Sequence, residues 1–534
     1  MPRRFPRRLL RNGAILTTAS LGLLMLPPRE SLPTESLLQA RVLFEGVGRV
    51  GRCAVAGALI FTDYKYSLWG CEEDQNIWNE VHQRSADRLV VLAETNGGLY
   101  VKSGQAFASM SHLLPREYYT TMRKLQDAVV SRPFSEVVTV LEQDLKKPIH
   151  NVFSSISETP IAAASLAQVH RATLASDGSD VAVKVQYIDI QARFHGDMAT
   201  IRAMLGVCGA AFPGFDFSTI ITKLNATIAK ELDFVTEARN SDRAGSDLKP
   251  IFGRSVITPY IHWEYSTPRV LITDFVQGVK ISDAEGMRRL GIDVPWAANA
   301  CYSALAYQMF ITGFAHGDPH AGNILVHRPS SNGRKWRKGE SQVVILDHGL
   351  YADMAPEIRV QLARIWSAAV RHNNAELKAV CAELDIGGDV AYKLVASMFL
   401  QHPYEHFSSF KRGMSEAELK LIQTEAQGKM KEFNDLIVKL PSDYALMLRS
   451  LSAQRAINKD LSNPVRRPLV MLRWSLRASH GGGQYSVGGS SALSLQWALV
   501  SAWWEEAKND MMMWVLKKYQ PRLYDKIEEA LSMA

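Results

Sequence analysis

The chain has 534 residues, of which 47% are hydrophobic and 22% charged, as is usual for a globular protein with more than one packed unit. Its formal net charge of +7 comes mostly from residues 1–29, which contain six arginines and no acidic residue. Because basic and acidic residues nearly balance in the rest of the chain, the composition argues against a nucleic-acid-binding protein. The five cysteines are scattered and include no C-x-x-C pair, which argues against a disulfide framework or a zinc site and favours a reducing compartment.

Residues 1–29 have the composition of a mitochondrial targeting segment, since they are rich in arginine and lack acids. Their apolar run, Ala14–Leu26, is shorter than the roughly 20 residues that span a membrane. A secretory signal and a disordered basic tail are the alternatives, and the cysteine pattern argues against the first of these. A second apolar run, Cys53–Phe61, leads us to expect a membrane-proximal segment over residues 30–71.

Residues 72–150 are expected to form a helical extension, because apolar side chains recur there near helical spacing. The two series are Trp78, Val81, Leu89 and Leu92, then Tyr118, Met122, Leu125 and Val129. Between them lies Gly97–Gln105, which contains Lys102, Gly104 and Gln105. By itself, this stretch predicts a solvent-exposed turn.

Residues 151–278 are predicted to form a strand-rich small lobe. Val169–Leu174 and Val181–Val185 are β-rich runs joined by a turn signal, which predicts a hairpin. Lys184 stands between valines on the second strand, as the lysine that binds the α- and β-phosphates does in kinases. Before the hairpin, a loop of Ala162, Ala163, Ala164 and Ser165 is placed to cover a nucleotide. Its alanines make it stiffer than a glycine loop and favour a helical turn.

A long amphipathic helix is predicted from Ile221 to Val235 and beyond, carrying Glu231, Asp233 and Glu237. Glu237 is the candidate partner of Lys184. The alternative is that all three acids are solvated. Two further strands are expected at Val256–Ile261 and Val270–Thr273.

Residues 279–480 are predicted to form a large lobe that opens with a helix over residues 295–314. The next stretch, His316–Asn323, and the later Asp347–His348–Gly349 each adjoin a short apolar run, which predicts two buried strands with polar loops. Asp318 has the position of a catalytic carboxylate that accepts the proton of a nucleophile. Asn323 and Asp347 are the candidate ligands of a magnesium ion. After Gly349 the chain is expected to be almost wholly helical, and residues 481–534 to form a glycine-rich linker with terminal helices.

This order of elements predicts an α+β, protein-kinase-like two-lobed fold with an N-terminal helical extension and an all-helical C-terminal region. The motifs resemble the UbiB/AarF family of atypical kinases. Lys102–Gln105 matches its K-x-G-Q, Ala162–Ser165 its alanine-rich loop, Glu231–Asp233 its E-x-D, and His316–Asn323 its H-x-D-P-H-P-G-N, except that Ala321 replaces a proline. Further stretches, such as Arg455–Asn458, look closest to the AarF domain-containing protein kinase 5 branch.

The resemblance implies that Lys102, Gly104 and Gln105 belong to helices covering the active cleft and meet Glu231 or Asp233 there. It also implies ATP or ADP with Mg²⁺ as ligands, mitochondrial residence, membrane association and a lipid or lipid-like partner.

Three features of the residues argue against an ordinary protein kinase. Gly317 replaces the arginine of H-R-D, and His320 stands where protein kinases tend to place a lysine near the transferred phosphate. The next helix is predicted to begin near Met354–Glu357, which leaves little activation segment to present a peptide. We therefore expect an ATPase or a small-molecule or lipid kinase at a mitochondrial membrane. A Ser/Thr protein kinase and a nucleotide-binding scaffold with little turnover are the alternatives.

Overall fold

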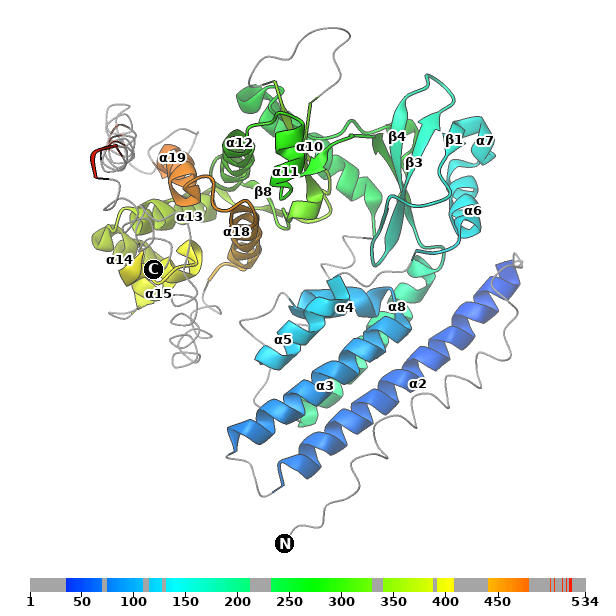
Figure 1. Ribbon diagram of the computed structural model, residues 1–534. Coiled ribbons are helices and arrows are strands. Elements are labelled where there is room, and N and C mark those ends of the chain that lie inside the picture. Colours follow the sequence, from blue (N-terminus) through cyan, green and yellow to red (C-terminus); the bar gives the residue numbers. More distant parts are fainter. Residues whose placement is uncertain are drawn as a thin grey trace. The chain divides into compact units, whose positions relative to one another are not determined.

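The structure is a computed structural model, and it describes residues 35–69, 74–108, 115–126, 131–211, 232–328, 340–387, 391–407 and 440–479, with a few positions between 500 and 520. It divides into two compact units (Figure 1). Unit 1 comprises Met1–Val235 and His262–Asp274, and unit 2 comprises Thr236–Ile261 and Phe275–Ala534. The predicted targeting segment, Glu231 and nearly all of residues 481–534 lie outside the described residues.

The N-terminal part of unit 1 is helical, which confirms the predicted extension. Its helices are α2 (Glu35–Ser67), α3 (Gln75–Asn96), α4 (Leu99–Ala108) and α5 (Arg116–Met122), continued by the 3₁₀ turn η1 (Arg123–Gln126). Buried residues such as Leu99, Leu125 and Ile190 form a core between these helices and α8 (Ile190–Ala211). Apolar residues at helical spacing supply this core, as amphipathic helices do generally.

The turn predicted for residues 97–105 is wrong beyond its first two positions. Gly97 has a φ of +65° and ends α3, because glycine tolerates this left-handed backbone where other residues are strained. From Leu99 onward the chain is helical as α4, so Lys102 and Gln105 lie in a helix. The turn signal of the two glycines therefore marks the boundary between two helices.

Unit 1 also contains a five-stranded antiparallel sheet. Its strands are β1 (Phe153–Ile156), β2 (Ala162–Ala163), β3 (Ala167–Leu174), β4 (Asp180–Gln186) and β6 (Val270–Asp274). β3 and β4 form the predicted hairpin, β6 pairs with the other edge of β4, and both β1 and β2 pair with β3. Val181, Val183 and Ile272 pack against α6 (Phe134–Leu145), so this face of the sheet is buried.

Unit 2 begins within α10 (Phe234–Phe252). The predicted helix over residues 221–235 is wrong at its C-terminal end, since α10 starts at Phe234 and Asp233 lies just before it. A four-stranded sheet follows in the order β5 (Val256–Ile257), β10 (Gln342–Ile345), β9 (Ile324–His327), β7 (Val279–Lys280). The strand expected over residues 256–261 is thus limited to its first two residues.

The helix predicted for residues 295–314 is present as α12 (Val294–Tyr307) and a π-helical turn, η3 (Gln308–Thr312). Gly313 ends it with a φ of +77°, as a left-handed C-cap does. The chain then forms β8 (Phe314–His316), which pairs with β11 (Tyr351–Asp353) in a separate two-stranded sheet. Because of β11, the region after Gly349 is not helical from its start.

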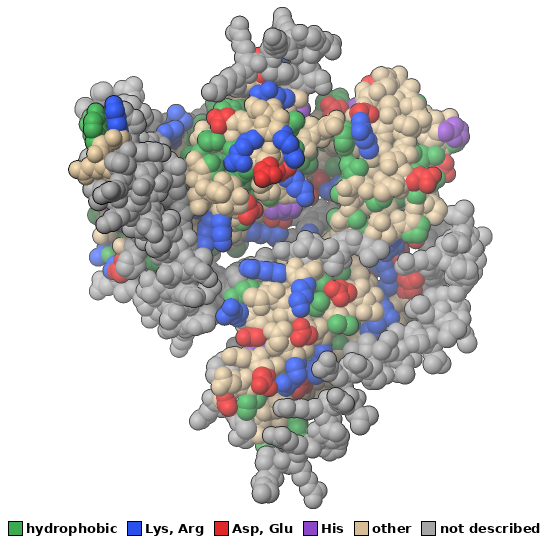
Figure 2. Space-filling view, in the orientation of Figure 1, with side chains coloured by type: hydrophobic (Ala, Val, Ile, Leu, Met, Phe, Trp, Pro, Cys, Tyr) green, Lys and Arg blue, Asp and Glu red, His purple; other side chains and the backbone are tan. Residues whose placement is uncertain are grey.

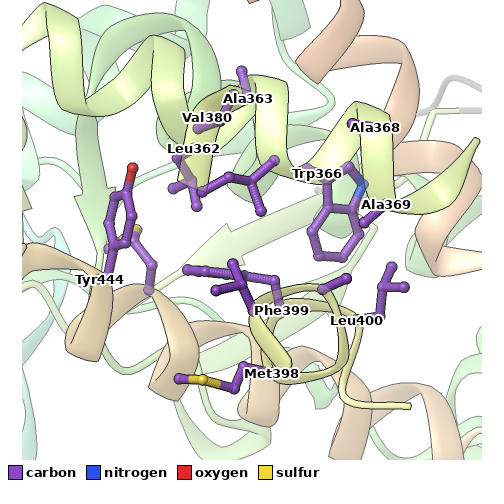
Figure 3. Packing of buried hydrophobic residues seen from close by; sticks show 14 of the residues in the cluster. Leu362, Ala363, Trp366, Ala368, Ala369, Val380, Met398, Phe399, Leu400 and Tyr444 are labelled. Atoms are coloured by element: carbon purple, nitrogen blue, oxygen red, sulfur yellow. The ribbon is translucent and has the colours of Figure 1, made fainter. Parts of the chain in front are cut away.

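The rest of unit 2 is a helical layer around one apolar core (Figure 3). The helices are α13 (Pro356–Val370), α14 (Asn374–Glu383), α15 (Ala391–Leu400), α18 (Ser442–Asp460) and α19 (Arg467–Ser479). Trp366, Phe399 and Tyr444 are all fully buried in this core, and the rings of Phe399 and Tyr444 pack edge to face with centroids 5.4 Å apart. This core fixes α18 relative to α13 and β11, which matters for the site described below.

Two further observations concern the charge of the surface and the crossing of a membrane. On the face drawn in Figure 2, basic and acidic side chains are interspersed over the described residues. Within the described residues, no helix combines the length and the apolar character that crossing a membrane requires.

Candidate functional site

Two loops of unit 2 carry the residues predicted to perform phosphoryl transfer. The catalytic loop, residues 317–323, connects β8 to β9, and the Asp347–Gly349 turn connects β10 to β11. Backbone hydrogen bonds tie the loops together at both ends. The Gly317 N–H donates to the Leu350 carbonyl at 2.8 Å, and the Leu346 N–H donates to the Asn323 carbonyl at 2.9 Å. Residues far apart in sequence are thereby held in one site.

Asn323 and Asp347, the predicted magnesium ligands, are each oriented by a hydrogen bond within their own loop. The Asn323 Nδ2 donates to the Asp318 carbonyl at 3.4 Å, which directs the nitrogen into the loop and leaves Oδ1 as the free acceptor. The Gly349 N–H donates to Asp347 Oδ1 at 3.0 Å and holds this carboxylate in place. Amide and carboxylate oxygens are the ligands that Mg²⁺ prefers, usually alongside phosphate oxygens and water. The described residues contain no group of three or more His, Cys, Asp or Glu side chains that could hold a metal alone.

Two buried histidines support these loops through hydrogen bonds. The Asp318 N–H donates to His316 Nδ1 at 3.1 Å, so the ring proton lies on Nε2. Burial lowers the pKa of His316, although the negative charges of Asp347 and Asp318 oppose this shift. The His348 Nε2–H donates to the Ile345 carbonyl at 3.0 Å, and the Tyr351 hydroxyl donates to His348 Nδ1 at 2.9 Å. His348, which replaces the phenylalanine of D-F-G, is therefore fixed by hydrogen bonds on both nitrogens.

α10 is fastened to the Asp347–Gly349 turn. The Asn240 Nδ2 donates to the His348 carbonyl at 2.9 Å. Glu237, in the first turn of α10, is 5% exposed, and its Oε2 lies 3.9 Å from the position that a Cβ on Gly349 would occupy. Asp233 precedes the helix and accepts the Val235 N–H on Oδ1 at 3.0 Å. Glu237 therefore lies beside the Asp347–Gly349 turn.

Lys184 lies on β4 of unit 1, opposite Val169 of β3 and Leu271 of β6. Its Nζ lies 5.0 Å from the centre of the Phe234 ring, a cation–π distance. Because side chains alternate along a strand, Lys184 points away from the buried face formed by Val183 and Val185. Lys184 and Glu237 belong to different units, and their pairing stays a prediction.

The alanine-rich loop is extended and does not form the helical turn that its alanines favour. Ala162 and Ala163 pair with β3 as strand β2, and the Ala164 N–H donates to the Ala167 carbonyl at 2.7 Å. Ala162 and Ala164 are exposed, whereas Ser165 is buried. Backbone pairing with β3 thus overrides the local helix propensity of alanine, as tertiary context often does.

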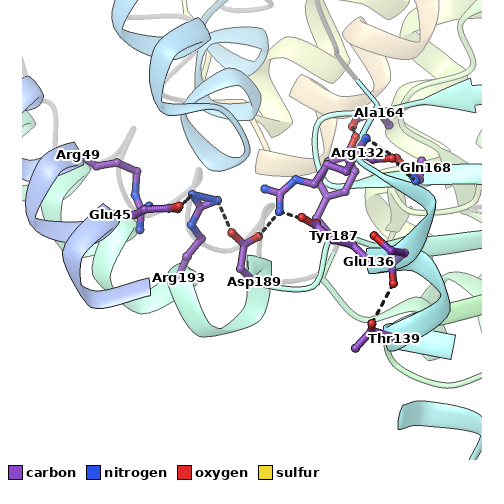
Figure 4. Close-up of polar contacts among 11 residues, drawn as sticks. Glu45, Arg49, Arg132, Glu136, Thr139, Ala164, Gln168, Tyr187, Asp189 and Arg193 are labelled. Carbon is purple, nitrogen blue, oxygen red and sulfur yellow. Dashed lines mark hydrogen bonds and ion pairs between the residues drawn. The ribbon is translucent and has the colours of Figure 1, made fainter. Parts of the chain in front are cut away.

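A tyrosine and a chain of ion pairs hold this loop (Figure 4). The Tyr187 hydroxyl donates to the Ala164 carbonyl at 2.8 Å, and the guanidinium of Arg132 lies 4.6 Å from the centre of the Tyr187 ring. Arg132 pairs with Asp189, and Asp189 pairs with Arg193, each at 2.8 Å. The chain continues to Glu45 on α2, at 3.2 Å from Arg193. No local pattern in the sequence indicates this network, because its members are spread over about 150 residues.

The K-x-G-Q residues have packing roles within the helical extension. The Gln105 Nε2 donates to the Leu125 carbonyl at 2.9 Å. A Cβ on Gly104 would lie 2.2 Å from Leu125 Cδ1, so only glycine allows α4 and η1 to approach this closely. Lys102 is half-buried on the same helix. Whether these residues meet Glu231 falls outside the described residues, and a contact with Asp233 stays a prediction.

One residue next to Asp318 was missed by the sequence interpretation. The Arg449 Nη2, on α18, donates to Asp318 Oδ2 at 2.7 Å. The two side chains are 35% and 29% exposed, so the pair lies at the edge of solvent. Arg449 belongs to none of the recognised motifs and follows Asp318 by 131 residues, so only the fold brings them together. His320 is exposed instead, and its Nδ1 accepts the Gly322 N–H at 3.1 Å.

Comparisons with known proteins show the family of the chain. Residues 124–381 match the model of the ABC1 atypical kinase-like domain. The chain is 34% identical to AarF domain-containing protein kinase 1 of Xenopus laevis over 422 residues, covering 78% of this chain and 79% of the relative. It is 36% identical over 397 residues to the probable serine/threonine-protein kinase abkD of Dictyostelium discoideum, but spans only 56% of that protein's length.

A solved structure from Mycobacterium tuberculosis, the complex of Rv3197 with erythromycin, covers 72% of this chain at 24% identity with a TM-score of 0.43. The kinase 5 branch is not confirmed, since the relatives named here include a kinase 1 protein. The matched domain contains Lys184, Glu237 and both loops of unit 2. This chain belongs to the ABC1/AarF (UbiB) family of atypical kinases, and its domain is kinase-like.

Proposed function

We propose that this protein binds ATP or ADP with Mg²⁺ and transfers the terminal phosphoryl group to water, a small molecule or a lipid at a mitochondrial membrane. Asp318 accepts or orients the proton of the nucleophile. Asn323 and Asp347 hold the metal, which neutralises charge on the phosphates when it is bound. Lys184 contacts the α- and β-phosphates and is oriented by Glu237, while Ala162–Ser165 and His320 line the nucleotide site.

The observation that carries the proposal is the pair of backbone hydrogen bonds joining the two loops. Gly317 to Leu350 and Leu346 to Asn323 hold Asp318, Asn323 and Asp347 as one preorganised set. Phosphoryl transfer depends mainly on positioning and electrostatic stabilisation, so a rigid set of this kind is what the reaction requires. All three groups carry oxygen atoms suited to magnesium or to a proton in transfer.

The short segment after Asp347 favours an acceptor other than a peptide. Tyr351–Asp353 is paired with β8, and α13 begins at Pro356. Arg243 pairs with Asp353 at 2.8 Å, and its guanidinium lies 3.9 Å from the centre of the Phe314 ring. The chain that presents peptides in protein kinases is therefore occupied here by strand pairing and side-chain contacts.

The exposed face of α2 supports membrane association. Val47, Val50 and Phe61 are 66%, 49% and 43% exposed, and exposed Ala54 and Ala58 stand between them at helical spacing. An apolar stripe of this kind suits a helix that lies along a lipid surface. The mitochondrial assignment rests on the arginine-rich, acid-free residues 1–29. Membership of the kinase 5 branch stays part of the proposal.

A nucleotide-binding and hydrolysis assay tests the proposal. The thermal unfolding midpoint and the rate of phosphate release are measured with Mg²⁺–ATP and Mg²⁺–ADP, with and without lipid vesicles. Wild type is expected to show a Mg²⁺-dependent rise in the midpoint that Asp347→Asn loses. Asp293→Asn is the matched control, because Asp293 is exposed and its side chain makes no capping hydrogen bond. No Mg²⁺-dependent rise in wild type would refute both the proposed activity and the protein kinase alternative.

Two further measurements separate the alternatives. A Ser/Thr protein kinase would transfer phosphate to protein in a substrate screen with the full chain. A nucleotide-binding scaffold would keep its cellular function in Asp318→Asn but lose nucleotide binding in Lys184→Ala. The proposed function instead requires that Asp318→Asn keep binding and lose turnover.

A further inference from the structure

The proposed catalytic carboxylate has a cation beside it that comes from another part of the chain. The Arg449 guanidinium donates from Nη2 to Asp318 Oδ2 at 2.7 Å. In protein kinases, the catalytic loop itself supplies positive charge, through the arginine of H-R-D and a lysine two residues after the aspartate. This loop has Gly317 and His320 at those positions.

Neither loop position can replace the missing cation. A Cβ on Gly317 would lie 3.0 Å from Leu350 Cγ and 3.2 Å from the Leu350 carbonyl oxygen, so a longer side chain would be crowded there. His320 is turned back on its own loop, where its Nδ1 accepts the Gly322 N–H. The positive charge at Asp318 is therefore provided by α18.

The fold fixes the backbone of Arg449 and leaves its side chain accessible. Tyr444, Met447 and Leu451 are fully buried on the same helix, and the Tyr444 hydroxyl donates to the Ile358 carbonyl at 3.0 Å. The side chain of Arg449 is 35% exposed. Within the described residues, the bond to Asp318 is the one hydrogen bond recorded for this guanidinium, whose Nε and Nη1 can meet a second anion.

We propose that Arg449 is a catalytic residue that binds the γ-phosphoryl group during transfer, and that its ion pair with Asp318 holds it where transfer occurs. This inference rests on the proposed function. In the reaction, the γ-phosphorus forms a bond to the acceptor oxygen and its bond to the β–γ bridging oxygen breaks, with the electron pair leaving on ADP. Asp318 takes the proton of the acceptor. Arg449 keeps its protons and stabilises the charge on the equatorial oxygens, as a planar guanidinium does well.

The test compares Arg449→Gln and Arg449→Lys with wild type in the full chain. Lys459→Gln is the matched control, since Lys459 is an exposed cation in the last turn of the same helix. Dissociation constants for Mg²⁺–ATP and Mg²⁺–ADP are measured together with kcat. Arg449→Gln is expected to lose any preference for ATP over ADP and about a hundred-fold in kcat, while its affinity for ADP stays within two-fold. Arg449→Lys should recover part of kcat, because lysine restores the positive charge but not the planar guanidinium with its several N–H donors.

The outcomes separate this inference from the proposed function. If wild type binds Mg²⁺–nucleotide and Arg449→Gln matches it in ATP preference and kcat, Arg449 is not catalytic but the proposed function stands. Faster turnover in Arg449→Gln would overturn the inference as well, since the ion pair would then be inhibitory. If wild type binds nucleotide but shows no turnover, the ratio of the dissociation constants for Mg²⁺–ADP and Mg²⁺–ATP decides. A preference for ATP that Arg449→Gln loses supports the inference, and an unchanged ratio overturns it. If wild type binds no nucleotide, both fail. Unfolding midpoints of both variants exclude misfolding, and Arg449→Lys keeps the test valid if the glutamine variant is unstable.

Discussion

Gly313 shows how one residue determines the path of the chain into the site. It follows the π-helical turn η3 and precedes β8, which leads into the catalytic loop. Its φ of +77° lies in the left-handed region, and a Cβ there would lie 2.9 Å from the Met354 carbonyl oxygen. Glycine is therefore required both by backbone conformation and by the space next to β11.

Gly313→Ala is expected to destabilise unit 2 by about 1–3 kcal/mol, because it adds left-handed strain and a contact with a carbonyl oxygen that cannot move away. The urea unfolding midpoint measures this loss. Gly387→Ala serves as the control, since a Cβ at Gly387 meets no atom within 4 Å. Equal midpoints for the two variants would contradict the strain argument.

His170 links the stability of unit 1 to pH. It is fully buried, its Nδ1–H donates to the Ser157 carbonyl at 2.7 Å, and its Nε2 faces the amide nitrogen of Gln168 at 3.2 Å. Burial lowers the pKa of His170 below the ordinary value of 6.5. Below pH 6.5 the histidine of the unfolded chain is protonated, whereas the buried His170 of the folded chain stays neutral. The stability that neutral His170 contributes is therefore fully present above pH 6.5 and is lost as the pH falls.

Wild type should therefore lose about 1 kcal/mol more of its unfolding free energy between pH 7.5 and 5.5 than His170→Asn does. Asparagine can still donate to the Ser157 carbonyl but does not titrate. Urea titrations of both proteins at the two pH values provide the comparison. Parallel losses in wild type and variant would show that His170 is not responsible.

At the scale of single residues, the sequence predicted which residues belong to the candidate site but not which residues lie next to them. Asp318, Asn323 and Asp347 could be named from spacing and from the apolar runs beside them, and all three lie on the loops that were expected to carry them. Arg449 could not, because nothing local distinguishes it from other arginines on a helix. His170 likewise has no sequence signal, since its lowered pKa comes from burial.

The elements of unit 1 hold the alanine-rich loop by backbone pairing and by one hydroxyl. Burial raises the pKa of Tyr187 to about 12, so its hydroxyl keeps its proton at neutral pH and donates to Ala164. The Arg132 guanidinium lies over the Tyr187 ring, and its ion pairs continue through Asp189 and Arg193 to Glu45 on α2. A shift of α2 is thereby connected, through these ion pairs, to the alanine-rich loop, which we propose covers the nucleotide.

Tyr187→Phe removes only the hydroxyl and should weaken Mg²⁺–nucleotide binding about five-fold, the typical worth of one hydrogen bond. Isothermal titration of the full chain measures this. Tyr265→Phe is the matched control, because Tyr265 is another tyrosine of unit 1, partly buried and packed against the apolar core of the sheet. A similar effect of both substitutions would mean that the hydroxyl of Tyr187 does not position the loop.

Periodicity predicted most elements but not all of their boundaries. The hairpin, the helical extension and α12 followed from apolar spacing and turn signals. The helix over residues 221–235 failed at its end, because an amphipathic pattern continues across a break that it does not encode. The alanine-rich loop failed because strand pairing is a tertiary contact that local propensity does not contain.

For the whole molecule, the chain crosses between its two units three times, at Val235, Ile261 and Asp274. The segment Thr236–Ile261 belongs to unit 2, where β5 pairs with β10 and Asn240 binds the His348 carbonyl. A large lobe that starts at residue 279, as the sequence predicts, lacks these two connections. The order of elements along the chain does not reveal these crossings. α10 and β5, which belong almost wholly to unit 2, lie between β4 and β6 of unit 1.

A fragment of residues 236–479 is therefore expected to unfold cooperatively, whereas a fragment of residues 275–479 should lose the edge of its sheet and the support of the Asp347–Gly349 turn. Circular dichroism melting and amide dispersion in NMR spectra compare the two. A shorter fragment that melts as sharply and at the same temperature would show that α10 and β5 are dispensable.

The position of Arg449 has a practical consequence for interpreting truncated or spliced forms of the chain. The segment that matches the family model ends at residue 381, and Glu237, Asp318, Asn323 and Asp347 all lie before that point. A product that stops there would contain all of these residues, yet its Asp318 would lack the neighbouring guanidinium of Arg449. Such a product would keep these signature residues and still lack α15, α18 and α19, which complete the apolar core around Trp366, so we expect it neither to fold stably nor to turn over nucleotide.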